Sequence, residues 1–213
     1  MAGWIYMWTL VVAMAVAALG AQAQPAGKGK LLYEITADDG AVARGAQLTQ
    51  GKAKTFHLSN EGSGQEPQIV WDETRHSNVI AFKVGPTPAD KVKDRSELHI
   101  YSGVDFDKTW ALGLKVFIPP GVEFTNNWHS LVQCPQANVL NPPFSLSLVA
   151  PGKFALVSRS DEDSYKVIEG GDFPKGRWVD LELEFRMGGA GHVKMWLDGK
   201  VVADKDAILR YKG

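Results

Sequence analysis

Short apolar or alternating runs, each ended by Gly, Pro, Asn or Asp, recur along this chain of 213 residues. No long stretch places apolar residues at the spacing of an amphipathic helix. Alternation of apolar and polar residues is typical of strands with one buried face. The runs expected to form strands are 31–36, 68–72, 78–84, 96–102, 109–118, 128–134, 144–150, 153–159, 177–187, 192–197 and 200–204. The pattern predicts an all-β sandwich of two antiparallel sheets, of the jelly-roll type.

Two connections between these runs predict hairpins. "APGK" joins 144–150 to 153–159, and "LDGK" joins 192–197 to 200–204 through Asp198-Gly199. Asp-Gly is a preferred two-residue turn because both positions need a positive φ. We find no repeat and no linker, so residues 31–213 are expected to form one domain.

The N-terminus predicts export. Residues 4–21 carry no charge and lead into "AQA" at 21–23, which is typical of a secretory signal cleaved after Ala23. Residues 24–30 would then be a flexible leader, and the mature protein would be secreted or periplasmic. No Lys or Arg precedes the apolar run, and the run is nearly long enough to span a bilayer, so an uncleaved anchor stays open.

Charge and cysteine usage limit the partners. The net charge is −1, which favours neither nucleic acid nor an anionic membrane surface. The single cysteine, Cys134, cannot form an internal disulfide and is expected to be a small buried residue. His57, His76 and His192 show no metal-ligand spacing and receive no role. We therefore expect a monomer that needs no metal and no cofactor.

The stretch "DRSELHIYSG" places Arg95, Glu97, His99 and Tyr101 at every second position. In a strand these four side chains share one face. Polar faces are common on half-buried strands, so the pattern alone fits either a solvated surface or a cleft.

A second predicted strand helps to decide between a solvated surface and a cleft. In "WHSLVQC" simple alternation puts His129, Leu131 and Gln133 on one face. Hydrogen-bond donors and a titratable group on a single surface suit a carboxylated sugar. Cleavage of a polyuronide by β-elimination removes the C5 proton next to a carboxylate, whose charge donors such as Arg, Gln or His must offset. A base and an acid complete the reaction, and His or Tyr can serve as either.

From about residue 76 onward the chain resembles the heparin lyase I-like polysaccharide lyases, the concanavalin-like jelly-roll group that includes glucuronan lyases. The segments that carry the resemblance, in the family's order, are "DRSEL" (94–98), "WALGLKVFIPPGVEF" (110–124), "WHSLVQ" (128–133), "PPFSLSLVAPGKFALVSR" (142–159) and "GRWVDLELEFRMGGAGHVKMWLDGKVV" (176–202). The resemblance implies a lyase acting on an acidic polysaccharide and covers more than half of the chain.

The resemblance assigns roles position by position. Arg95 matches an Arg that helps hold the substrate, with Glu97 as its organiser and Tyr101 on the same face. Gln133 matches a Gln that helps neutralise the uronate carboxylate. The family's His two residues later is absent, because position 135 is Pro. His129 or His99 could take its place, although neither stands at the motif position.

A second departure concerns the base. The family continues with a strand resembling Tyr-x-Lys-x-Gly-x-Tyr, whose Tyr serves as base and acid, whereas the sequence ends with "LRYKG" at 209–213. Tyr211 is the candidate that this sequence offers. The catalytic Tyr of a truncated chain would instead lie beyond Gly213, and Tyr211 would simply end the sheet.

Two other functions stay open. "DLELE" places Asp180, Glu182 and Glu184 on one strand face, and paired carboxylates could serve a retaining glycoside hydrolase. A solvated acidic face is the simpler interpretation. The sandwich also suits a carbohydrate-binding module without catalysis. Most tryptophans beyond the apolar run are expected in the core; they are Trp71, Trp110, Trp128, Trp178 and Trp196.

Overall fold

The computed structural model describes residues 56–61, 65–84, 95–100, 105–124, 129–136 and 141–211. Within these ranges the chain forms twelve strands and no helix, and all neighbouring strands pair antiparallel. The strands are β1 (Phe56–Glu61), β2 (Gln65–Asp72), β3 (Ser77–Lys83), β4 (Arg95–Ile100), β5 (Thr109–Phe117), β6 (His129–Cys134), β7 (Phe144–Val149), β8 (Lys153–Ser158), β9 (Lys166–Asp172), β10 (Trp178–Arg186), β11 (Gly191–Leu197) and β12 (Lys200–Ala207). The all-β prediction is confirmed.

The expected strand at 31–36, the leader and the N-terminal apolar run lie outside the described residues. A search of the described ranges for a helix long and apolar enough to cross a membrane finds none.

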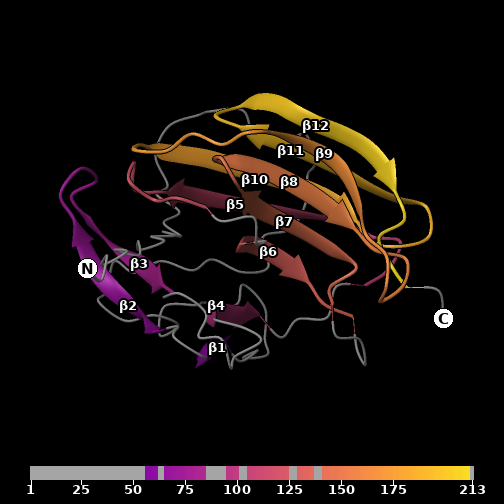
Figure 1. The fold of residues 1–213 in the computed structure, drawn as a ribbon, viewed down its shortest axis with the longest axis horizontal. Helices are drawn as coiled ribbons and strands as arrows, with labels where there is room; N and C mark the ends of the chain where they lie inside the picture. The colour runs from indigo at the N-terminus through magenta and orange to yellow at the C-terminus, as the bar shows by residue number, and fades with distance from the viewer. Residues whose placement is uncertain are drawn as a thin grey trace, which may run out of the picture.

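Two four-stranded sheets pack face to face (Figure 1). We call the sheet of order β6-β7-β8-β9 sheet A and the sheet of order β12-β11-β10-β5 sheet B. Their facing side chains form one continuous core. The Phe144 ring of sheet A lies 5.6 Å from the Phe185 ring of sheet B, centroid to centroid. Aromatic pairs at this separation add about 0.5–1.5 kcal/mol to the burial of their area.

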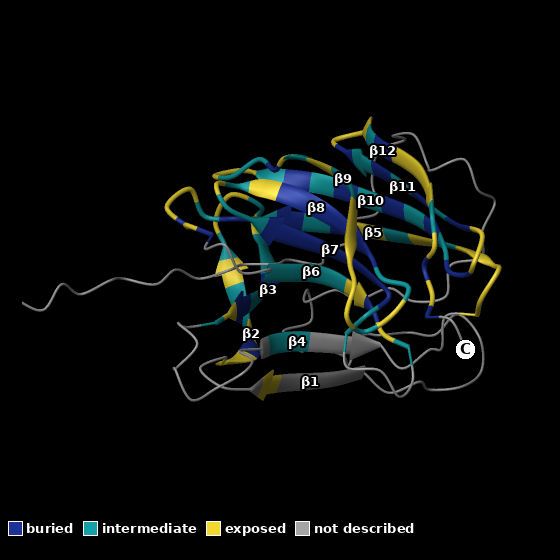
Figure 2. Ribbon diagram, turned by 45° about the vertical axis from the view of Figure 1, so that its right-hand side comes forward, coloured by how far each residue is buried: buried dark blue, intermediate teal, exposed yellow. Residues whose placement is uncertain are grey.

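Strand β10 shows why alternation predicted these strands. Its residues alternate between half-buried and buried along all nine positions, and Val179, Leu181, Leu183 and Phe185 form the buried set. A period of two places that set on the core side and the charged residues between them on the outer side. Strands β7 and β8 lie inside sheet A and are mostly buried on both faces (Figure 2).

Strands β1 and β9 were not predicted from the sequence pattern. Strand β9 carries Gly170-Gly171, a pair that is depleted in strands. The structure gives a reason for the second glycine: a Cβ at Gly171 would lie 2.9 Å from Cε1 of Phe154 on β8. The Phe154 ring therefore needs this position to be free of a side chain.

Both expected hairpins are confirmed. The β7–β8 turn closes with the Gly152 amide donating to the Val149 carbonyl at 2.9 Å. The β11–β12 turn uses positive φ angles of 50° at Asp198 and 75° at Gly199. These angles are those of the turn type that matches the twist of paired strands.

Two smaller strand pairs flank the sandwich. Strand β1 pairs with β4, and β2 pairs with β3. In both views β4 and β1 lie beyond β6, on the side away from β7, and they form a separate two-stranded sheet (Figures 1 and 2). The β2–β3 turn reaches sheet B, where Trp178 donates its indole N–H to the Thr74 hydroxyl at 3.2 Å. The Arg75 guanidinium stands 5.0 Å from the centre of the same indole.

The prediction for Cys134 is confirmed, and the prediction for the tryptophans is largely wrong. Cys134 is buried, and burial raises the pKa of its thiol to about 12. Trp110 packs against the core, but Trp71 is 54% exposed. Trp178 and Trp196 are half-buried on the outer side of sheet B, and Trp128 lies outside the described residues.

Candidate active site on the outer face of sheet A

A bulge in β6 decides which of its residues share a face. Ser130 pairs with Ser147 and Val132 with Leu146, so Leu131 is the extra residue. A bulge shifts the alternation by one position. The residues before and after Leu131 therefore no longer follow a single period of two.

The expectation that His129 and Gln133 share a face is wrong for this reason. His129 pairs with Leu148, which is fully buried in the core, whereas Gln133 pairs with Ser145 on the opposite face. The ring of His129 lies 5.5 Å from the ring of Phe124, another core residue. Burial lowers the pKa of the His129 imidazole, which favours the neutral form.

Gln133 lies on the face of sheet A that points away from the core, here called the outer face of sheet A. Its side chain is exposed and makes no hydrogen bond with a described residue. The residues in register with it on the neighbouring strands are Ser145, Val157 and Val167, and the next row on this face holds Ser130, Ser147, Ala155 and Gly170. The Ser130 and Ser147 hydroxyl oxygens lie 3.1 Å apart and hydrogen-bond to each other. The exposed Gln133 amide thus lies beside uncharged and largely buried residues of β7 and β8.

Strand β4 carries the alternating polar residues that the sequence singled out. Its register with β1 places Arg95 opposite Glu61, Glu97 opposite Ser59 and His99 opposite His57. Directly opposite residues of antiparallel strands share a face, so the expected polar face of β4 extends onto β1. The sequence analysis gave His57 no role, because only the strand pairing brings it opposite His99.

The side chains of β4 are described in part. Glu97 is half-buried, whereas the side chains of Arg95 and His99 and the whole of Tyr101 lie outside the described part of the chain. The structure therefore places Arg95 and His99 by backbone register. Both residues belong to β4, which lies beyond β6 on the side away from β7 in both views (Figures 1 and 2).

Tyr211 lies in a different environment from Gln133. Only 6% of Tyr211 is exposed, and its hydroxyl donates to the Asn141 carbonyl at 3.0 Å. Its backbone N–H donates to Oε1 of Gln136 at 3.0 Å. Burial and the nearby Glu162 carboxylate raise the pKa of the Tyr211 phenol. These contacts tie Tyr211 to the segments that leave β6 and enter β7, which is a structural role.

The acidic residues of β10 lie on the outer side of sheet B. Asp180 forms an ion pair with Lys115 of β5. Glu182 stands between Gly113 and Trp196, and burial together with the Asp180 charge raises the pKa of its carboxyl group. This arrangement agrees with the alternation that the sequence showed.

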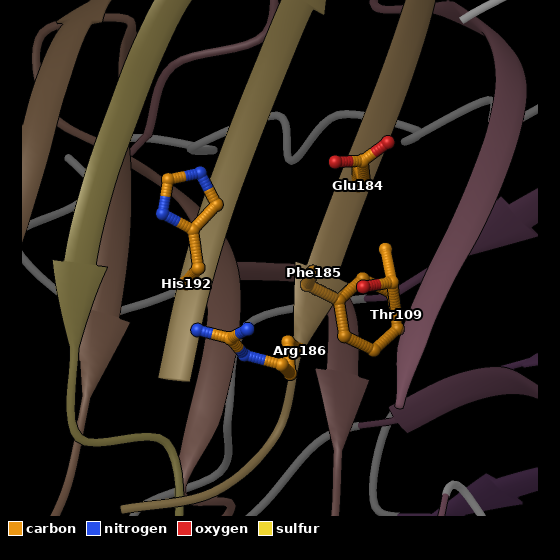
Figure 3. Close-up of a pocket in the computed structure, with 5 residues that line it drawn as sticks. All are labelled: Thr109, Glu184, Phe185, Arg186 and His192. Carbon is orange, nitrogen blue, oxygen red and sulfur yellow. The ribbon is translucent and has the colours of Figure 1, made fainter. Parts of the chain in front are cut away.

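An open depression of about 270 Å³ lies at the Glu184 end of this side. Figure 3 shows Arg186 between Thr109 and His192. Glu184 precedes Arg186 by two residues on the same face of β10. The Arg186 guanidinium is held by the Ala190 carbonyl at 2.8 and 3.1 Å. The His192 ring nitrogens are 3.2 Å from Asp204 and 2.8 Å from Asp206. The two basic groups that line the depression, Arg186 and His192, are therefore already bound by other groups of the protein.

Comparisons with known proteins agree with this architecture. The crystal structure of endo-β-1,4-glucuronan lyase from the fungus Trichoderma reesei superposes with a TM-score of 0.58 at 14% identity, covering 74% of each chain. At this identity the likeness shows the fold, and the jelly-roll prediction is confirmed. A search of curated proteins gives no match. The family model described as Polysaccharide lyase matches residues 48–213, well over half of the sequence. The chain therefore belongs to the polysaccharide lyase family.

Proposed function

We propose that this protein is an exported lyase that cleaves a uronate-containing acidic polysaccharide by β-elimination on the outer face of sheet A. One observation carries the proposal: Gln133 presents an exposed amide, without a hydrogen-bond partner among the described residues, on the outer face of sheet A. Such a group is suited to receive the carboxylate of a uronate.

The reaction needs few groups. A base removes the C5 proton, electrons shift toward the carboxylate, the C4–O4 bond breaks, and an acid protonates O4 while a C4=C5 double bond forms. Gln133 and Arg95 would donate to the carboxylate, and Glu97 would orient Arg95. We assign proton transfer to His99, on the Arg95 face of β4. His129 faces the core side and Tyr211 is engaged with Asn141, so both are weaker candidates.

Charge supports the choice of sheet. The outer side of sheet B carries five carboxylates, Asp180, Glu182, Glu184, Asp204 and Asp206, together with the guanidinium of Arg186. Lys115 and Lys194 pair with two of them. A polyanion is repelled from such a surface. In contrast, the residues of sheet A in register with Gln133 are uncharged: Ser145, Val157 and Val167.

Ultraviolet absorbance of the mature protein mixed with polyuronates tests the proposal. The C4=C5 double bond absorbs, whereas hydrolysis products do not. Glucuronan is the first polymer to try, since the similar fold belongs to a glucuronan lyase. We expect Gln133→Ala to lower the rate by about 10²–10³, the usual cost of removing a preorganised donor. Gln68→Ala, at an exposed position of β2, is the matched control and should keep full activity. Equal activity of wild type and Gln133→Ala would exclude this face.

Export has its own test. The uncharged run at 4–21 and the "AQA" at 21–23 support cleavage after Ala23. N-terminal sequencing of the protein from an expressing culture should begin at Gln24. A chain that retains Met1 and sediments with membranes would contradict export by cleavage.

A second candidate is hydrolysis at sheet B, favoured by the raised pKa of Glu182 and by the depression beside Glu184. A glycosidase needs one carboxyl group kept protonated as the acid. New reducing ends without a rise in absorbance, lost in Glu184→Gln, would establish it. Binding of a polymer without any product would instead indicate a carbohydrate-binding module.

A further inference from the structure

We infer that Ser145 is a second carboxylate-binding residue, which acts together with Gln133 on the same uronate group. The inference deepens the proposed function and rests on it. It starts from the register of β6 and β7, in which Ser145 stands directly opposite Gln133. Side chains at directly opposite positions start from Cβ atoms about 4.5–5.5 Å apart, a distance that two donors to one carboxylate can share.

The Ser145 hydroxyl is available for a ligand. Its side chain makes no hydrogen bond with any described residue. Among the described residues, the buried side-chain atoms that lack a partner are Arg75 Nε, Ser77 Oγ and Ser96 Oγ. Ser145 Oγ is not one of them, and 7% of the residue is exposed.

Ser147 differs from Ser145 in having a hydrogen-bond partner. It lies on the same face of β7, two residues from Ser145, and is also buried, with 1% exposed against 7% for Ser145. Its hydroxyl, however, bonds to that of Ser130 at 3.1 Å. The same chemical group therefore occurs twice on this face, once used by the protein and once left for a ligand. Val157, on the other side of Ser145 in β8, offers no competing polar group.

The chemistry of β-elimination gives this hydroxyl a purpose. As the C5 proton leaves, negative charge grows on both carboxylate oxygens. Gln133 can donate an amide N–H to one oxygen and Ser145 its O–H to the other. Donors placed where charge develops stabilise the transition state more than the bound substrate. The low exposure of Ser145 strengthens the effect, because a hydrogen bond shielded from water is electrostatically stronger.

The test compares Ser145→Ala with Ser147→Ala on a polyuronate and on its methyl ester. A hydrogen bond to a charged group predicts about a ten- to hundredfold loss of kcat/KM in Ser145→Ala, expressed mainly in kcat. The loss should shrink on the ester, which carries no charge. Ser147→Ala should stay within about threefold of wild type on both polymers, and Ser145→Thr should recover most of the rate. Unchanged melting temperatures would show that both variants fold.

The outcomes separate the inference from the function. Wild-type rates in Ser145→Ala, or equal losses in the two serine variants, would overturn the role of Ser145. If the wild-type protein cleaves no polymer, calorimetric binding of a uronate oligosaccharide replaces the rate. Weaker binding by Ser145→Ala than by Ser147→Ala would then keep the inference and remove the lyase function. Absence of both cleavage and binding would remove both.

Discussion

His129 and Gln133 lie on opposite faces of β6, because the bulge at Leu131 intervenes between them. The imidazole consequently faces Phe124 and the core, while the amide faces outward beside Ser145. The bulge therefore places one residue of β6 against the core and the other on the face proposed to bind substrate. The first prediction concerns the residue on the core side.

His129 should make the protein less stable in mild acid. Burial lowers the pKa of His129 in the folded state, so the unfolded chain binds more protons below the ordinary histidine value of 6.5. The free energy of unfolding should therefore fall as the pH drops through 6.5 toward the lower folded pKa. His129→Phe keeps the stacking on Phe124 and should reduce this fall. Urea titrations of the wild type and of His129→Phe at pH 7 and pH 5 measure the free energy of unfolding. An identical fall in the two proteins would contradict the role of His129.

Two glycines of sheet B, Gly191 on β11 and Gly113 on β5, should respond differently to alanine. A Cβ at Gly191 would lie 2.6 Å from the Ala207 carbonyl oxygen and 2.9 Å from Cγ of Leu209. Gly191→Ala should cost about 1–3 kcal/mol through overpacking. Gly113 has no atom within 4 Å of such a Cβ, so Gly113→Ala should be neutral or stabilising by about 0.5–1 kcal/mol. Urea midpoints measure both, and equal effects would show that space does not decide the outcome.

Cys134 should be unreactive while the protein is folded. It is buried in the core beside Phe144, and burial raises the pKa of its thiol to about 12. The thiolate is the reactive form, so almost none is present at neutral pH. A thiol-specific disulfide reagent should label the chain in guanidinium chloride and leave the native protein unlabelled. Rapid labelling of the native protein would place Cys134 at the surface.

Local sequence predicted the parts of this fold in which alternation is uninterrupted. Strands β5 and β10 keep a strict period of two, so their charged residues could be placed on the outer side in advance. The same rule failed in β6, since a bulge depends on how the strand pairs with β7. It also missed β9, where Gly170-Gly171 gives no periodic signal and the reason for glycine is a ring on β8.

The residues of the candidate site likewise divide into those that local sequence predicted and those that it did not. Gln133 and the alternating Arg95, Glu97 and His99 could be selected from the sequence, because each motif is local. The availability of Ser145, the place of His57 and the engagement of Tyr211 depend on pairings between distant segments. Spacing along the chain carries no signal for such pairings.

The contacts of Tyr211 connect the C-terminal segment to the substrate face. Its hydroxyl holds Asn141, which leads into β7, and its backbone amide holds Gln136, which follows Gln133 by three residues. The strand edge that presents Gln133 is thus fastened by a residue almost 80 positions away. Loss of these two contacts would loosen this edge while the core between sheets A and B stayed intact. A change at Tyr211 would therefore act on the proposed substrate face before it acted on folding.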